Sequence, residues 1–279
     1  MTHECSGAVR QRGVTMNRQG YPSDVTDAQW AIIAPLLPNP NKVPGGPGRP
    51  PADLRLIVNG IFYQAKAGCQ WRLLPHEFGP WQTVYDYFNR WSRDGVWAEV
   101  MEALHRLERE RQGRAPEPMT GSIDSQSVKS ATQGNAVGFD GGKQTKGRKR
   151  HLLVDTLGLM LTVVVMAANV GDRAGLKQLL RGYFDGATRW LRKIWVDGGY
   201  DGVPLKAWLA RVISPSIDLD VVQRPSSGFH LVKRRWVVER TFSWLFNDRR
   251  HSKDYEVLTR NSEAMIQAAM IHLLARRLA

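Results

Sequence analysis

The spacing of apolar residues changes once along the chain, near residue 112, and this change limits the folds that are possible. Before it, apolar residues recur at helical spacing, as in the stretch from Leu54 to Ala65. After it, short runs rich in Val and Leu alternate with amphipathic stretches, which is typical of strands alternating with helices. We therefore predict a disordered tail over 1–20, an all-helical unit over 21–112 and a mixed sheet flanked by helices over 113–279.

Local signals define the predicted helices of the first unit. Thr26 and Gln29 form a capping box ahead of an apolar helix. A second helix begins after Asp53 and ends at Gly68, a residue that commonly caps helices. The same spacing predicts helices over 81–93 and 96–111.

The second unit is predicted to contain strands and helices in alternation. "MTGSIDSQSV" reads as a short strand, and "RKRHLLVDTLGLMLTVVVMAAN" as two strands around a turn at 156–158. Further along, "DRAGLKQLLRGYF" and "VPLKAWLARV" are predicted helices, and "RKIWVDGGY" and "LDVVQR" predicted strands. Two helices end the chain, one holding Glu239 and one over about 261–278. The Gly- and Lys-rich segment "NAVGFDGGKQTKGRKR" is interpreted as a basic loop.

The chain carries a large positive charge. Lys and Arg number 39 against 26 Asp and Glu, a formal net charge of +13. Such a balance is unusual for a metabolic enzyme and common in proteins that neutralise phosphates, so nucleic acid is the expected partner. A basic surface kept for solubility is the alternative. With only two cysteines and no apolar run near the ~20 residues of a membrane span, we expect a cytoplasmic protein.

Three acidic residues occupy positions where carboxylates are uncommon. Asp124 in "SIDSQS" and Asp197 in "IWVDGGY" are each predicted at the end of a strand, where an open sheet forms a cleft. Glu239 lies in the basic and apolar helix "KRRWVVERTFSWLFNDRR". Burying a carboxylate among such neighbours costs several kcal/mol unless a cation compensates it.

A shared metal site would explain all three acids. Mg²⁺ prefers oxygen ligands, and two ions about 3.5 to 4 Å apart could activate a hydroxyl and stabilise the leaving oxygen of a phosphodiester. Two simpler interpretations stay open. Each aspartate could end its strand in a turn, and Glu239 could pair with Arg235 one helical turn away, a contact worth only ~0.3 to 0.5 kcal/mol if exposed.

Basic and polar residues suggest where DNA would be held. The helix over 81–93 leaves Thr83, Asn89, Arg90 and Arg93 on its polar face, where Asn and Arg could read bases in the major groove. A solvated polar face is the alternative. Contacts to the DNA backbone are predicted for the basic segment, by Lys143, Lys146, Arg148, Lys149 and Arg150. Backbone contacts are also predicted around Glu239, by Arg235, Arg249 and Arg250, the last two about three turns beyond Glu239 if its helix continues.

The motifs together resemble a known family. In order, they are "GIFYQAKAGCQWRLLPHEFGPWQTVYDYFNRW", "SIDSQSVKS", "WVDGGYDG" and "RRWVVERTFSWL", and from Tyr21 onward the chain is similar to bacterial DDE transposases of the insertion-sequence-five group. The resemblance implies a ribonuclease H-like catalytic domain with Asp124, Asp197 and Glu239 as its triad, binding Mg²⁺ or Mn²⁺, two ions per site. In one departure from the family signature, Val232 stands in place of a tyrosine and Phe246 in place of a basic residue.

The resemblance also sets expectations for partners and for function. It implies a helix-turn-helix-like N-terminal domain that binds the terminal inverted repeats of an insertion sequence, cleavage and strand transfer into target DNA, and a homodimer or higher oligomer in a synaptic complex. Two other functions remain open: a ribonuclease H-like, structure-specific endonuclease, and a catalytically inactive DNA-binding regulator. The helical unit favours the transposase over the endonuclease, and the three acids disfavour the regulator.

Overall fold

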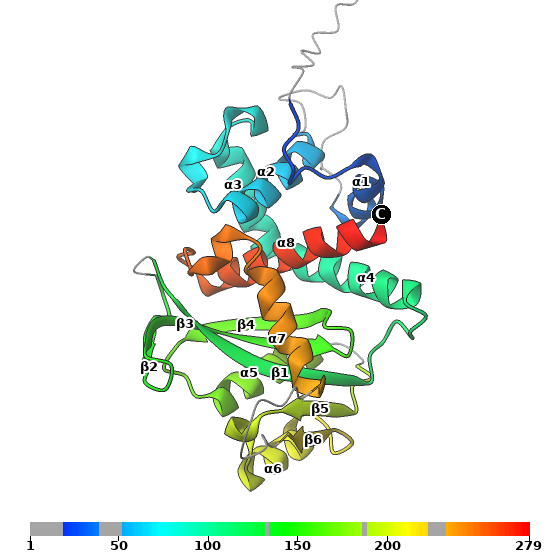
Figure 1. Ribbon diagram of the computed structural model, residues 1–279, viewed down its shortest axis with the longest axis vertical. Helices are drawn as coiled ribbons and strands as arrows, with labels where there is room; N and C mark the ends of the chain where they lie inside the picture. Colours follow the sequence, from blue (N-terminus) through cyan, green and yellow to red (C-terminus); the bar gives the residue numbers. More distant parts are fainter. Residues whose placement is uncertain (1–18, 39–51, 132–133, 186–188, 223–232) are drawn as a thin grey trace, which may run out of the picture.

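The computed structural model describes residues 19–38, 52–131, 134–185, 189–222 and 233–279. The tail predicted over 1–20 lies almost entirely outside these residues. Helices form one half of the molecule and a sheet with its own helices forms the other, with a long helix crossing the face of the sheet (Figure 1). This arrangement confirms the predicted order, a helical region followed by a mixed sheet flanked by helices, and is consistent with a ribonuclease H-like α+β fold.

The first half contains the four predicted helices. They are α1 (Asp27–Ile33), α2 (Leu54–Ala67), α3 (Trp81–Arg93) and α4 (Val96–Arg111). The capping box is confirmed, because the Thr26 hydroxyl accepts from the Gln29 amide and the Gln29 side chain accepts from the Thr26 amide. Gly68 ends α2 in the left-handed conformation at φ +70°, which glycine adopts without steric strain.

In the described part of the chain, six strands form one sheet. They are β1 (Thr120–Lys129), β2 (Gly138–Asp140), β3 (Thr145–Asp155), β4 (Met160–Ala167), β5 (Lys193–Val196) and β6 (Asp218–Val221). The strand order is β2-β3-β1-β5-β6, and β4 also pairs with β3. β1, β5 and β6 are parallel, whereas β3 is antiparallel to both β1 and β4.

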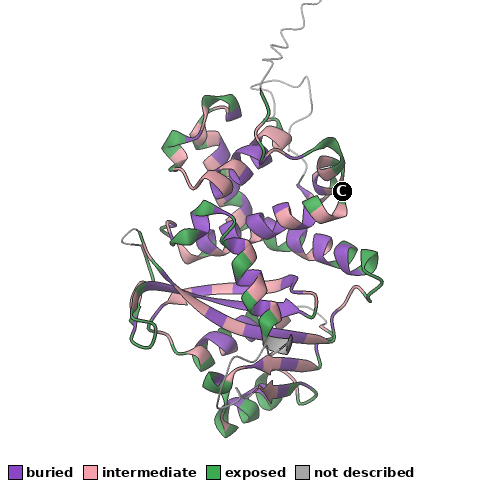
Figure 2. Ribbon diagram, viewed as in Figure 1, coloured by how far each residue is buried: buried purple, intermediate pink, exposed green. Residues whose placement is uncertain are grey.

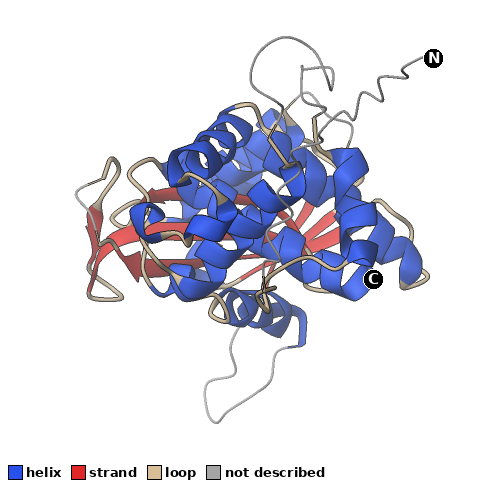
Figure 3. Cartoon of the chain, turned by 90° about the horizontal axis from the view of Figure 1, so that it is seen from above, coloured by secondary structure: helices blue, strands red, loops and turns tan. Residues whose placement is uncertain are grey.

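Helices cover both faces of the sheet, as the view from above shows (Figure 3). Side chains alternate between the two faces, so Leu153 packs with α5 (Asp172–Phe184) and α6 (Val203–Val212). Its neighbours Leu152 and Val154 pack with α7 (Lys233–Leu245) and α8 (Thr259–Leu278). These alternating positions fix which residues of β1 face α7.

The last helix in the sequence, α8, joins the two halves. It packs on α4, α2 and α3 on one side and on β4 on the other. One hydrophobic core therefore runs from the helical half to one face of the sheet. The proposed domain boundaries stay a prediction, and α8 would belong to the helical half by its contacts. No helix in the described ranges is both long enough and apolar enough to cross a membrane.

Two sequence-based expectations about secondary structure were wrong. The segment interpreted as a basic loop contains β2 and the first residues of β3, because pairing of β2 with β3, and of β3 with β1, overrides the low strand preference of Gly and Lys. Gly147 is suited to this pairing, since a Cβ there would lie 2.0 Å from the carbonyl oxygen of Val128. The helix holding Glu239 ends at Leu245, so Arg249 and Arg250 lie on a separate 3-10 helix, η5 (Arg249–Ser252).

Candidate active site

Asp124 and Asp197 lie at the same level on neighbouring parallel strands. The ladder between β1 and β5 includes the pair Ser122 and Trp195, and each aspartate lies two residues beyond its member of that pair. Asp124 is inside β1, not at its end as expected, whereas Asp197 does follow the last residue of β5. Asp124 pairs with Leu152, whose side chain packs beneath α7 and α8, so the alternation of side chains directs Asp124 to the face covered by α7.

Backbone amides hold both carboxylates. Oδ1 of Asp124 accepts from the amide of Ser125 at 2.7 Å. Oδ1 of Asp197 accepts from the amide of Gly199 at 2.9 Å and so caps the 3-10 helix η4 (Gly198–Tyr200). Both residues are partly exposed. Each carboxylate is therefore held by the backbone of its own segment and is partly accessible to solvent.

Glu239 lies on the helix that crosses this face of the sheet. α7 packs across β1, β3 and β5, with Val238, Phe242 and Leu245 in the core. Glu239 itself is exposed, and Figure 2 shows exposed positions along α7 above the sheet. The expectation that this carboxylate is buried among apolar side chains was wrong, because a rotation of about 100° per residue places it beside the buried stripe of α7.

The opposite flank of α7 shows which way Glu239 faces. The Thr241 hydroxyl donates to the carbonyl of Gly158 at 2.7 Å, so this flank rests on the turn between β3 and β4. That turn lies near the start of β1, where Gly121 pairs with Asp155. Two residues of helix rotate by about 200°, so Glu239 lies on the flank of α7 opposite this turn.

The residue types of these acids suit a metal site, but the structure does not bring all three of them together. Carboxylate oxygens on adjacent strands are ligands of the kind that Mg²⁺ and Mn²⁺ prefer. Among the residues that the structure describes, however, no group of three or more His, Cys, Asp or Glu side chains lies close enough to hold a metal ion. Asp124 and Asp197 therefore fit a divalent cation by chemistry and register, and the participation of Glu239 stays a prediction.

Comparison with known protein families identifies the chain. Residues 115–274, more than half of its length, match the family model described as "Transposase DDE domain". The chain belongs to the DDE transposases. Residues 25–101 match a second model, described as "Putative transposase of IS4/5 family". The first match covers the sheet, α5 to α7 and most of α8, and the second covers α1 to α3 and the start of α4.

Curated relatives match smaller parts of this transposase. The "Insertion element IS402 uncharacterized 16.2 kDa protein" of Burkholderia cepacia is 32% identical over 117 residues, which are 41% of this chain and 78% of the relative. The "Putative transposase for insertion sequence element IS402" of the same organism is 35% identical over 111 residues, 37% of this chain and 51% of that relative. The chain thus spans about half the length of this second relative.

Four of the basic residues predicted to contact DNA lie inside the transposase. Arg148, Lys149, Arg150 and Arg250 are all buried. Arg150 donates to the carbonyl of His251, and Arg250 pairs with the carboxylate of Glu256 at 2.6 Å. These side chains bind the protein's own chain, so the prediction that they contact a DNA backbone is withdrawn. The three residues of β3 are buried because a strand inside the sheet turns alternate side chains toward the helices on its two faces, and Arg250 is buried on η5 beside Glu256.

Other predicted contacts remain on the surface. Arg90, Arg93, Lys146 and Arg249 are exposed, and Thr83 is partly exposed. The ammonium group of Lys143 donates to the carbonyl of Ser125 at 2.8 Å, on the strand of Asp124. The side-chain oxygen of Asn89 accepts from Arg260 and Asn261 at the start of α8. The Arg235 side chain lies outside the described part of the structure.

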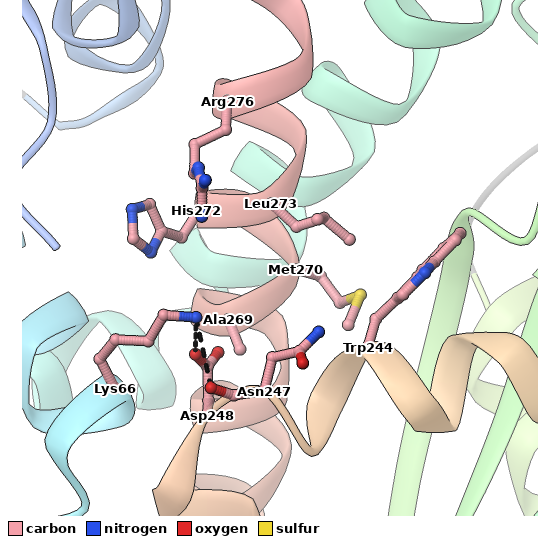
Figure 4. A pocket seen from close by; sticks show the side chains of 9 residues that line it. All are labelled: Lys66, Trp244, Asn247, Asp248, Ala269, Met270, His272, Leu273 and Arg276. Carbon is pink, nitrogen blue, oxygen red and sulfur yellow. Dashed lines mark hydrogen bonds and ion pairs between the residues drawn. The ribbon is translucent and has the colours of Figure 1, made fainter. Parts of the chain in front are cut away.

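A cavity of about 360 Å³ lies between α2, the end of α7 and α8 (Figure 4). Lys66 and Asp248 form an ion pair of 2.6 Å at one side of it. Burial raises the pKa of Asp248 above its usual value, and the neighbouring Lys66 opposes that rise. None of the three candidate catalytic acids lines this cavity, so it is separate from the candidate active site.

Sequence reasoning missed one acid near the two aspartates, Asp172. A Cβ added to Gly199 would lie 3.1 Å from Oδ1 of Asp197 and 3.8 Å from Oδ2 of Asp172, so the two carboxylates flank the same glycine. The only signal in the sequence is an acid at the first position of a predicted helix. That position is common for acids in any helix and does not point to a site.

Proposed function

We propose that this transposase binds the terminal inverted repeats of its insertion sequence and catalyses metal-dependent DNA cleavage and strand transfer. The observation that carries the proposal is the common level of Asp124 and Asp197 on neighbouring parallel segments, with Asp124 on the face covered by the helix that bears Glu239. The match of this part of the chain to a DDE transposase domain supports it.

In this proposal the three carboxylates hold the divalent cations, Mg²⁺ or Mn²⁺, two per site. When bound, such ions activate the attacking hydroxyl and stabilise the leaving oxygen of a phosphodiester. Asp124 and Asp197 each accept from a backbone amide, which keeps one oxygen of each carboxylate oriented. The proposal requires Glu239 to join them when metal and DNA are bound. A homodimer or higher oligomer that pairs two element ends is part of the same proposal.

The exposed cations would hold the DNA substrate. Lys146 lies on the strand next to β1, and Arg249 lies beside the C-terminal cap of α2 at Gly68. Both can contact phosphates without giving up internal partners that stabilise the core. Their contribution would be independent of sequence and sensitive to salt.

The helical half would supply sequence recognition through α3. Arg90 is exposed, and its guanidinium stacks on the ring of Tyr87 at 4.8 Å from the ring centre, which restrains it on the surface. We expect Arg90→Ala to weaken binding to the element ends by about 5- to 150-fold, the range for losing one base contact. Binding to unrelated DNA should change little. Fluorescence anisotropy with both DNAs at several salt concentrations measures this.

Arg106→Ala is the matched control, because it removes an exposed arginine from the neighbouring helix α4. Equal weakening of Arg90→Ala on both DNAs would indicate a phosphate contact instead of base recognition. Binding of the Arg90 variant at the wild-type level on both would rule out a role for this face of α3.

One assay distinguishes the proposed function from its two alternatives. Purified full-length protein is incubated with Mg²⁺ or Mn²⁺ and DNA carrying the element ends. We expect cleaved ends and products joined to target DNA. Cleavage of branched DNA without joining would support a structure-specific endonuclease, and binding without either product would support an inactive regulator.

A further inference from the structure

Polar and charged side chains form a network with β1 on the face opposite Asp124. The Ser125 hydroxyl donates to Oδ1 of Asp172 at 2.8 Å, and the Ser127 hydroxyl donates to Oδ2 of Asp140 at 2.6 Å. Lys149 lies between the two acids, with its ammonium group 3.2 Å from a carboxylate oxygen of each. β1 is therefore tied to α5, β2 and β3 along the segment that contains Asp124.

The charges in this network depend on one another. Lys149 is buried, and a buried ammonium without partners costs several kcal/mol. Asp140 and Asp172 compensate it, and the Ser127 hydroxyl together with Lys149 holds the pKa of Asp140 far below its usual value against the effect of burial. Removing the charge of Asp172 would leave the ammonium of Lys149 less compensated beneath β1.

Asp172 is also close to the segment that carries Asp197. The hydroxyl of Tyr200, at the end of η4, is buried. Burial raises the pKa of Tyr200 well above its usual value, and the negative charges of Asp172, Asp124 and Asp197 add to the rise. Asp172 and Asp197 also flank Gly199, where an added Cβ would lie 3.8 Å from Oδ2 of Asp172 and 3.1 Å from Oδ1 of Asp197.

We propose that Asp172 is a positioning residue for Asp124, acting through Ser125 and Lys149. Its bond to the Ser125 hydroxyl fixes the residue whose backbone amide holds Oδ1 of Asp124. Its charge offsets that of Lys149, so that less positive charge opposes a divalent cation at Asp124. The inference rests on the proposed metal-dependent function. Partners that orient a metal ligand are commonly worth 10- to 100-fold in metal affinity.

The test is direct binding of Mn²⁺ to the full-length protein without DNA, followed by electron paramagnetic resonance. Asp172→Asn keeps the shape and an oxygen that can accept from Ser125 but removes the charge. We expect the dissociation constant for Mn²⁺ to rise by about 10-fold or more. Asp27→Asn is the matched control, because Asp27 is also the first residue of a helix and pairs with an arginine, Arg55, at 2.6 Å.

A second variant separates positioning from folding. Ser125→Ala removes the hydroxyl that links Asp172 to the segment of Asp124 and leaves every charge in place. We expect a smaller rise in the dissociation constant for Mn²⁺, with thermal unfolding close to wild type. If Asp172→Asn does not fold, this variant decides: wild-type Mn²⁺ affinity in Ser125→Ala would then overturn the inference.

The outcomes separate this inference from the proposed function. If wild type binds Mn²⁺, Asp124→Asn does not and Asp172→Asn binds like wild type, Asp172 has no positioning role and the proposed function stands. If wild type and Asp124→Asn bind Mn²⁺ equally weakly, the proposed metal site itself is wrong. If Asp172→Asn folds, binds Mn²⁺ with wild-type affinity and unfolds at a lower temperature, the role of Asp172 is structural only.

Discussion

Asp124→Asn, Asp197→Asn and Glu239→Gln are each expected to reduce DNA cleavage by about 1,000-fold or more. Bound metal ions stabilise a phosphoryl-transfer transition state by several kcal/mol, and each 1.4 kcal/mol is a factor of ten in rate. The amides keep nearly the shape of the carboxylates, so the fold should be retained. Single-turnover cleavage of labelled element ends measures the rate, and anisotropy measures binding to the same DNA, which should stay within a few-fold of wild type.

Asp201→Asn is the matched control for Asp197, because it removes an exposed carboxylate four positions further along the same segment. Its cleavage rate should equal that of wild type. The result for Glu239→Gln is the most informative of the three, since Glu239 does not form a cluster with the two aspartates in the structure. Wild-type cleavage by this variant would remove Glu239 from the active site and leave a site of two aspartates.

The fold could be predicted largely from local patterns. Helix α5 (172–184) and helix α4 (96–111) have the predicted bounds, because amphipathic spacing and flanking glycines are signals carried within one helix. The turn between β3 and β4 was predicted for the same reason. The first residues of β3, 145–147, were not predicted, because they become a strand only through pairing with β2 and, at Gly147, with Lys129 of β1.

The candidate site could be predicted in part. The acids were found because carboxylates are uncommon in strands, and parallel pairing places Asp124 and Asp197 at one level. The exposure of Glu239 depends on how α7 is rotated about its own axis against the sheet. The apolar residues in the sequence of α7 do not define one rotation. The burial of the arginines was missed because each has acceptors contributed from distant parts of the chain, as Arg148 shows.

Arg148→Met is expected to lower the free energy of unfolding by about 3 to 5 kcal/mol. The guanidinium group is fully buried and donates to Oδ1 of Asp254 at 2.9 Å and to the hydroxyl of Ser262 at 2.9 Å. It also donates to the carbonyls of Glu256 and Val257, both at 2.7 Å. Methionine fills a similar volume and supplies no donors. The buried carboxylate of Asp254 would then lack its cation, and urea unfolding followed by circular dichroism measures the loss.

The matched control is Lys146→Met, which makes the same kind of change at an exposed position on the same face of β3. Its unfolding free energy should lie within about 0.5 kcal/mol of wild type. The double variant Arg148→Met with Asp254→Asn should recover part of the loss, because removing both charges leaves no uncompensated ion in the core. A loss below about 1 kcal/mol for Arg148→Met alone would contradict a structural role.

Lys146→Met and Arg148→Met also show which cations of the basic segment contact DNA and which only stabilise the fold. A residue that contacts a DNA phosphate should reduce the salt dependence of binding by about one unit when removed and leave unfolding unchanged. We expect that result for Lys146→Met and the opposite one for Arg148→Met. The reason is that β3 turns Arg148 toward Asp254 and α8 inside the protein, whereas Lys146 lies beyond the buried part of the strand. In a paired strand, burial of each side chain, and not the net charge of the segment, determines which cations can reach DNA.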